Sequence, residues 1–137
     1  MTNSEYAVEL HNKGYNCCQS VVCALAKEMG YNEETMFRAA EGFGLGMGNS
    51  KNTCGSVCGM VMCLGLLNSA GDLEAPLATK RATMGLASQM TDRFLEEHGS
   101  VICGVLKGQT GCPVVPCDVS ISDAVRYVEE VIAAQKV

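Results

Sequence analysis

Helix start and stop signals occur along the whole chain, and they constrain its fold more than any other feature. No segment alternates strictly between polar and apolar residues, which is the pattern of a half-buried strand. The sequence therefore predicts an all-α fold, a compact bundle of about five to six helices around one buried central helix. A length of 137 residues fits one domain, so we expect a single helical domain over residues 1–137.

Capping residues and glycines separate the expected helices. Asn16 begins one of them, and Gln19 completes a capping-box pattern three residues later. The central segment is apolar almost all round, as in a helix buried on most faces, and Gly55 and Gly59 would let a neighbouring helix approach closely. The predicted helices run from Asn3 or Ser4 to Gly14, from Asn16 to Gly30, from Asn32 to Gly42, from Asn52 or Thr53 to about Asn68, from about Leu77 to His98, and from a cap formed by Ser120 and Asp123 onward, with a short helical turn from Ser100 to Leu106.

Glycine occupies every second position of residues 42–48, between the third and fourth predicted helices. Such a segment can adopt positive φ angles and bring its backbone close to a bound group. It is not a dinucleotide-binding fingerprint, because Met47 and Asn49 stand where the last glycine would be needed and no strand precedes it. We expect a loop that wraps a buried site, with a flexible connection as the alternative. The glycines concerned are Gly42, Gly44, Gly46 and Gly48.

Charge and hydropathy argue against two classes of partner. A formal net charge of −5 with ten scattered basic residues is unlike a nucleic-acid-binding surface, so we expect no nucleic-acid partner. The apolar central segment is shorter than a membrane span and is interrupted by glycines, so we expect no membrane insertion. The first residues show neither the basic nor the apolar region of a signal peptide, which predicts a chain that stays in the reducing cytoplasm.

Nine cysteines dominate the chemistry open to this chain. A reducing compartment disfavours stable disulfides, and an odd number of cysteines cannot pair completely within one chain. Four of them, Cys17, Cys54, Cys103 and Cys117, fall at expected helix N-termini. The helix dipole and free backbone N–H groups lower the pKa of a thiol there and favour the thiolate, which binds metals and attacks disulfides. We therefore expect these four to be the functional thiols.

Two further cysteines are candidates for the same site. Cys58 follows Cys54 by one helical turn, so the two side chains can share a face. Cys58 is open to three interpretations: a ligand, a resolving thiol or a core residue. Cys112 is joined to Cys117 by the stiff segment Pro-Val-Val-Pro, which could hold both thiols towards one point. Cys112 is therefore a further candidate ligand.

The remaining cysteines and both histidines are predicted to lie outside the site. Cys23 and Cys63 occupy mid-helix positions that are typical of core packing. Cys18 is adjacent to Cys17, but neighbouring helical residues face different directions. We expect His11 and His98 at the surface, and not as ligands, because no spacing pairs them.

Local signatures of known sites are absent from the sequence. There is no C-x-x-C pair, no plant-type cluster-binding run and no haem attachment motif. Serine-hydrolase, zinc-peptidase and phosphate-loop motifs are also missing. Any metal site must therefore be assembled by the fold from distant cysteines.

The order of features resembles the redox-active protein family named for its own cysteine pattern, C-GCAxxG-C-C, over nearly the whole chain. The matching features are Asn16-Cys17 opening a helix, the glycine run of residues 42–48, the segment Thr53-Cys54-Gly-Ser-Val-Cys-Gly59, and then Cys103 and Cys117. The resemblance implies a small helical domain with a redox or metal role, and it carries four cysteines onto Cys17, Cys54, Cys103 and Cys117. A similar domain is associated with split-Soret cytochromes, where an iron–sulfur cluster is suspected, but this chain lacks their haem attachment motifs.

The chain also departs from the family motif. Thr53 and Gly55 stand where the literal motif has Gly and Ala, and Cys58 stands where it has Gly. The glycine follows one position later, at Gly59. The identity of the cysteine that acts as thiol partner near the central helix is therefore left open.

Three functions fit these observations. The leading hypothesis is an electron carrier or redox sensor that holds an iron–sulfur cluster through Cys17, Cys54, Cys103 and Cys117. The second is a thiol–disulfide oxidoreductase, in which Cys54 and Cys58, or Cys112 and Cys117, form the reactive pair. The third is a structural zinc domain with four thiolate ligands.

The sequence carries less information about partners. We expect a carrier or sensor rather than an enzyme, and any enzymatic activity would be that of an oxidoreductase. The redox partner protein is not identified by any motif, and a homo-oligomer is left open.

Overall fold

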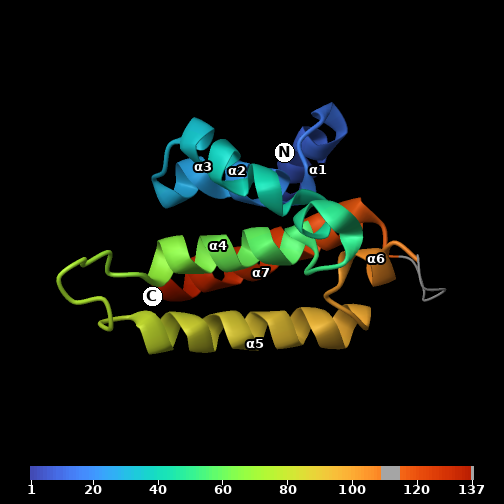
Figure 1. Cartoon of the computed structure of the whole chain (residues 1–137). Coiled ribbons are helices and arrows are strands. Elements are labelled where there is room, and N and C mark those ends of the chain that lie inside the picture. Colours follow the sequence, from blue (N-terminus) through green and yellow to red (C-terminus); the bar gives the residue numbers. More distant parts are fainter. Residues whose placement is uncertain (109–114, 137) are drawn as a thin grey trace.

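A computed structural model describes residues 1–108 and 115–136. Over these residues the all-α prediction is confirmed, because the chain forms helices and no strand (Figure 1). The elements are α1 (Asn3–Lys13), α2 (Cys17–Met29), α3 (Glu33–Ala40), the short turns η1 (Glu41–Phe43) and η2 (Gly46–Ser50), α4 (Gly55–Asn68), α5 (Lys80–His98), α6 (Cys103–Leu106) and α7 (Cys117–Gln135). The described chain has seven α-helices, so the expectation of five to six is too low.

Helices α2 and α3 begin at their predicted caps, Asn16 and Asn32, whereas α1 is capped by Thr2 instead of Asn3 or Ser4. Thr2 Oγ1 accepts a hydrogen bond from the Glu5 amide at 3.1 Å at the start of α1. Asn16 and Gln19 form both bonds of a capping box, at 2.9 and 3.0 Å, so the predicted capping box is confirmed. These starts are predictable because each depends on residues within one turn.

The clearest differences from the predicted boundaries concern the starts of α7 and α5. The last helix begins at Cys117 directly after Pro116, so a cap at Ser120 and Asp123 is wrong. The Ser120 amide already donates to the Pro116 carbonyl at 3.1 Å, which places Ser120 inside the first turn. Helix α5 begins at Lys80 instead of Leu77, and Leu77 is exposed within the preceding turns.

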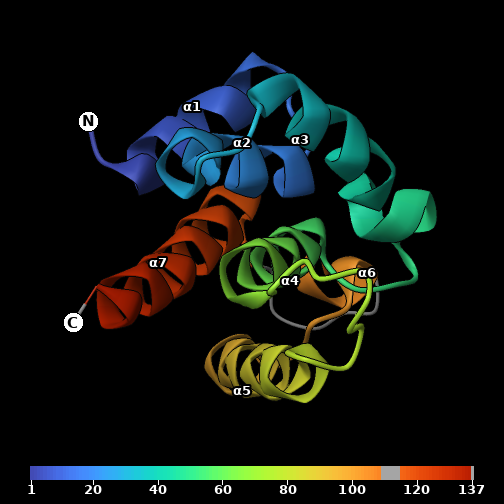
Figure 2. The same cartoon turned by 90° about the vertical axis from the view of Figure 1, so that its left-hand side faces the viewer.

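The helices form three layers (Figures 1 and 2). Helices α1, α2 and α3 lie on one side, α4 and α7 in the middle, and α5 on the other side, where it packs against α4. Helices α2, α4 and α7 share the core, which does not surround α4 alone. This corrects the prediction of one central helix. Nine successive residues of α2, from Cys18 to Ala26, are buried, as are eight residues of α7. None of the described helices has the length and apolar character needed to cross a membrane.

Two glycines allow α4 to lie unusually close to α2. A Cβ atom on Gly59 would come within 3.0 Å of the Cys18 carbonyl oxygen and of Val21 Cβ. One turn earlier, a Cβ on Gly55 would come within 3.2 Å of Cys17 Cβ. The predicted close approach of a helix at Gly55 and Gly59 is therefore confirmed, and the helix is α2.

Candidate metal centre

One cavity brings together the four cysteines that the sequence places at helix starts. It has a volume of about 190 Å³ and is lined by residues at or next to the starts of α2, α4, α6 and α7. Its lining consists of Cys17, Cys54, Cys103, Cys117, His11, Asn16, Leu45, Gly55, Leu106, Lys107, Val115 and Ser120.

An isolated antiparallel bridge places Cys54 near Cys103. Thr53 pairs with Ile102, and the amide of each following cysteine donates to a carbonyl of the opposite segment, at 2.6 and 3.0 Å. Cys54 is the N-cap residue of α4, and Cys103 is the first residue of α6. Both side chains are buried. The bridge therefore holds two thiols from distant parts of the sequence at one wall of the cavity.

Cys17 is positioned by the start of α2. Asn16, its capping neighbour, donates through Nδ2 to the Glu41 carbonyl at 2.9 Å. A Cβ atom on Gly44 would lie 2.4 Å from the Asn16 side chain, so glycine is required for this contact. On the α4 side, Gly55 has no Cβ and so leaves room for the Cys17 side chain. The start of α2 is thus fixed against both η1 and α4.

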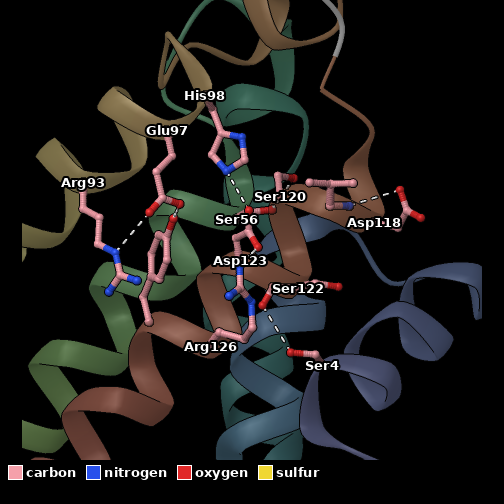
Figure 3. A network of polar contacts seen from close by, with 12 residues as sticks. Ser4, Ser56, Arg93, Glu97, His98, Asp118, Ser120, Ser122, Asp123 and Arg126 are labelled. Atoms are coloured by element: carbon pink, nitrogen blue, oxygen red, sulfur yellow. Dashed lines mark hydrogen bonds and ion pairs between the residues drawn. The ribbon is translucent and has the colours of Figure 1, made fainter.

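Cys117 opens α7, and two buried serines connect this helix start to α4. The Ser120 hydroxyl donates to the Cys117 carbonyl at 2.9 Å. It also lies 3.0 Å from the Ser56 hydroxyl (Figure 3). Ser56 also contacts the Cys17 thiol. Because buried hydroxyl groups are costly without hydrogen-bond partners, this network favours one relative placement of the two helix starts.

The thiols of Cys17 and Cys117 form a hydrogen-bonded pair with opposite pKa shifts. The hydrogen bond that Cys17 donates lowers the pKa of Cys117 to about 6, and Lys107 and His11 add to this effect. The same bond, together with burial, raises the pKa of Cys17 far above its usual range. Within the pair, the Cys117 thiol therefore ionises more readily than the Cys17 thiol.

The expectation of low pKa values at all the helix starts is therefore met at Cys117 and is wrong at Cys17 and Cys103. Burial raises the pKa of Cys103, although Lys107 opposes the shift. Helix α6, with four residues, is too short to offer a strong helix dipole there. The hydrogen bond with Cys117 and burial outweigh the helix end at Cys17, and burial outweighs it at Cys103.

His11 is half-buried and lines the cavity, so the prediction that it lies outside the site is wrong. Its imidazole and the sulfurs of Cys17 and Cys117 all lie within 4.8 Å of one another. Its Nδ1 lies 2.9 Å from the Tyr15 carbonyl oxygen. No spacing rule could have identified His11, because the turn between α1 and α2 determines where its ring lies.

Cys58 lies apart from this cavity. Its sulfur donates to the Thr53 carbonyl at 3.8 Å, and burial raises its pKa to about 11. Cys54 lines the cavity and Cys58 does not. The nearby Cys54 thiol also contributes to the raised pKa of Cys58, and a dithiol pair of Cys54 and Cys58 stays a prediction. The remaining candidate ligand, Cys112, falls outside the described residues.

Three cysteines pack in the core. Cys18 and Cys63 are completely buried and Cys23 nearly so. Burial raises the pKa of Cys63 to about 12 and that of Cys23 to about 11, so both are protonated at neutral pH. The predicted core role of Cys23 and Cys63 is confirmed.

The glycine run contributes to the site through its packing. Gly44 and Gly46 are buried, whereas Gly42 and Gly48 are exposed. A Cβ atom on Gly46 would lie 2.5 Å from Cys103 Cβ. Leu45 is the residue of this segment that lines the cavity. A direct contact between these glycines and a cofactor stays a prediction.

The second histidine, His98, lies near the end of α5 with its side chain largely covered, so its predicted surface position is wrong. Its Nε2 lies 2.8 Å from Asp123 Oδ2, with the two side chains 10% and 14% exposed. Its ring packs against Phe94 with the centroids 4.5 Å apart. Packing of α5 beside α7 covers a ring that a single helix would have left exposed.

His98 and Asp123 belong to a polar network between α5 and α7 (Figure 3). Glu97 also lies close enough for the three to surround an ion. However, Arg93 pairs with Glu97, and Arg126 pairs with Asp123, so the carboxylates already have cationic partners. We therefore assign this network to holding the two helices together.

A model of the family described as "Putative redox-active protein (C_GCAxxG_C_C)" matches residues 15–131. The chain belongs to this family. The match confirms the resemblance drawn from the order of cysteines and glycines, and the matched range includes Cys17, Cys54, Cys103 and Cys117. No curated protein and no solved structure matches the chain.

The donor set around the cavity suits a thiophilic metal or an iron–sulfur cluster. Four cysteine sulfurs are the usual ligand number for such clusters, and four thiolates also bind zinc. Carboxylates, which hard cations such as Mg²⁺ and Ca²⁺ prefer, are absent from the described lining. The residues present therefore fit a thiolate-bound metal or cluster.

Proposed function

We propose that this protein binds an iron–sulfur cluster through Cys17, Cys54, Cys103 and Cys117 and serves in electron transfer or redox sensing. The observation that carries the proposal is that all four line one cavity. Membership of a redox-active family supports the same function. A bound cluster would supply one-electron redox chemistry. The chain's own contribution is to hold four thiolates around a largely apolar, half-enclosed space.

Anaerobic purification and reconstitution with iron and sulfide test this function. We expect iron, acid-labile sulfide and visible absorption, all of which should be lost on exposure to air or chelators. Cys54→Ser should lose the cofactor while its helical content stays near wild type, because Ser lacks the soft thiolate.

Cys63→Ala is the matched control from the same helix. It should keep the cofactor and cost at most about 1 to 2 kcal/mol of stability through the small lost volume. Colourless protein without iron after reconstitution would contradict the proposal. A colourless protein that retains zinc would instead identify a structural zinc site.

A second candidate function rests on the proximity of Cys17 and Cys117, whose sulfurs lie within 4.8 Å of each other. In metal-free protein, the Cys117 thiolate can attack a substrate disulfide, forming a mixed disulfide and releasing the other substrate sulfur, which takes up a proton. Cys17 then loses its proton and attacks the Cys117 sulfur, which releases the second substrate thiol. The substrate disulfide gains two electrons, and Cys17 and Cys117 become a disulfide.

Trapping distinguishes this candidate from the first. Metal-free Cys17→Ser protein, mixed with an aromatic disulfide, should stop at a mixed disulfide on Cys117, detected by mass spectrometry. Wild-type protein should proceed to the internal disulfide. Absence of both products would exclude thiol–disulfide exchange at this pair.

A further inference from the structure

The imidazole of His11 is placed like a metal ligand among the cavity thiols. It comes from the last turn of α1, and it meets Cys17 and Cys117 with all three potential ligand atoms within 4.8 Å of one another. Metal–sulfur and metal–nitrogen bonds to zinc are about 2.3 and 2.0 Å, so ligand atoms around one ion lie roughly 3 to 4 Å apart. The three side chains can therefore reach one ion without a change in the fold.

The turn after α1 determines which nitrogen is available. A backbone carbonyl can only accept a hydrogen bond, so the 2.9 Å contact with Tyr15 O requires the proton on His11 Nδ1. The neutral ring then carries its lone pair on Nε2. Metal-binding histidines commonly have this arrangement, in which one ring nitrogen donates to a carbonyl and the other binds the ion.

The contact with Tyr15 is itself well supported. The Tyr15 amide donates to the Leu10 carbonyl at 3.1 Å, and the Gly14 amide donates to the His11 carbonyl at 3.0 Å. Gly14 has a φ of 124°, which glycine adopts more readily than other residues. The turn is therefore closed on both sides of His11, and the ring is oriented by the backbone before any ion binds.

We propose that His11 binds the metal through Nε2 beside Cys17 and Cys117, so that the centre has mixed thiolate and imidazole ligands. This inference rests on the proposed function, because it assumes that the cavity holds a thiolate-bound metal. Neither Cys54 nor Cys103 belongs to the 4.8 Å group. The centre thus has a Cys17–Cys117–His11 side and a Cys54–Cys103 side.

The test uses the presence of only two histidines in the chain. Wild-type protein labelled with ¹⁵N-histidine is reconstituted anaerobically with iron and sulfide, and in parallel loaded with Co²⁺ alone. Pulsed EPR of the reduced iron centre should show a directly coordinated imidazole nitrogen. His11→Ala should lose that signal, and His98→Ala should keep it, because His98 lies in the α5–α7 network.

Metal retention and potential provide independent measurements. Co²⁺ binding should weaken at least about tenfold in His11→Ala, since even substitutions in outer-shell partners commonly have that effect. His11→Cys should restore binding, lose the nitrogen signal and lower the reduction potential, because neutral imidazole ligands raise the potential relative to thiolates.

The outcomes separate this inference from the proposed function. If wild-type protein binds iron or Co²⁺ but shows no coordinated nitrogen, His11 is not a ligand and the cysteine site stands. If neither metal binds, the proposed function fails and this inference fails with it. If His11→Ala does not fold, circular dichroism will show it. The assignment is then made from His98→Ala. A coordinated-nitrogen signal that persists in this variant supports His11 as the ligand, and loss of the signal in this variant overturns the inference.

Discussion

At the scale of single residues, the asymmetry between Cys17 and Cys117 governs the chemistry of the metal-free site. The two thiols are similar in kind, yet one hydrogen bond raises the pKa of the donor and lowers that of the acceptor. A thiolate with a pKa near ambient pH is an effective nucleophile. Cys117 is therefore the residue that should react first when the site holds no metal.

Alkylation of metal-free protein should show this order. The lowered pKa of Cys117 means that its thiolate is present above about pH 6 and is lost as the pH falls through that value. The iodoacetamide rate at Cys117, followed by peptide mass spectrometry, should rise with a midpoint near pH 6, whereas Cys17 should stay unmodified. Cys17→Ala removes the hydrogen-bond donor and should move the midpoint to higher pH. An unchanged midpoint in this variant would show that the thiol pair does not set the pKa.

At the scale of helices, the contact between α2 and α4 decides where the site is built, because both helices begin at the cavity. Gly59 has a Cβ position 3.0 Å from the Cys18 carbonyl oxygen, which is backbone and cannot rotate away. Gly65 lies on the same helix, and no atom would lie within 4 Å of its Cβ. These two glycines therefore offer a matched comparison.

Gly59→Ala should destabilise the protein by about 1 to 3 kcal/mol, because the added methyl group forces α2 away from α4. Gly65→Ala should be neutral or stabilising by up to about 1 kcal/mol, because alanine favours the helix. Chemical denaturation of both variants measures the difference. Equal effects would mean that the close approach of α2 and α4 has no energetic importance.

The segment of residues 42–48 permits a second comparison, which concerns the site itself. Gly46 and Gly48 both have positive φ, at 58° and 86°, but only Gly46 has a neighbouring atom where its Cβ would lie. The nearest such atom is Cys103 Cβ at 2.5 Å, followed by the Asn52 carbonyl oxygen at 3.0 Å. The two positions therefore share backbone strain and differ in contact with the cavity.

Gly46→Ala should reduce cofactor retention severalfold more than Gly48→Ala, because only the first displaces Cys103. Both should lose about 1 kcal/mol of stability from the unfavourable φ angle. Iron content per protein after reconstitution is the measurement. Similar retention in both variants would indicate that Cys103 tolerates movement or is not a ligand.

At the scale of the whole molecule, a bound metal would connect four helix starts. Cys17, Cys54, Cys103 and Cys117 come from the beginnings of α2, α4, α6 and α7, and the unfolded chain does not hold them together. A ligand that binds only the native state stabilises it by mass action, by about 4 kcal/mol when its free concentration is 1,000 times Kd. Cofactor binding should therefore be visible in unfolding.

Removal of the metal by a chelator should lower Tm under anaerobic conditions, as measured by differential scanning calorimetry. Cys54→Ser should show a low Tm that the chelator does not change further. Cys63→Ala should respond to the chelator like wild type, because its thiol packs in the core. A wild-type Tm unaffected by the chelator would contradict a metal held by the native fold.

The sequence by itself determined the features that depend on near neighbours along the chain. Asn16 and Gln19 cap α2 because they lie within one turn, Gly14 and Gly30 end their helices through their own backbone, and Cys63 is apolar in an apolar helix. The four helix-end cysteines were identified by the same local logic. The error at Ser120 arose because Pro116 offers an earlier start to the same helix.

Only the tertiary structure decided what depends on distance through space. The single cavity lined by Cys17, Cys54, Cys103 and Cys117 arises from the Thr53–Ile102 bridge and from the packing of α2 on α4. The proximity of His11 and the opposite pKa shifts of the Cys17–Cys117 pair depend on contacts between helices that are far apart in the sequence. Such contacts leave no periodic pattern, because burial and electrostatic interactions depend on separation in space and not on separation along the chain.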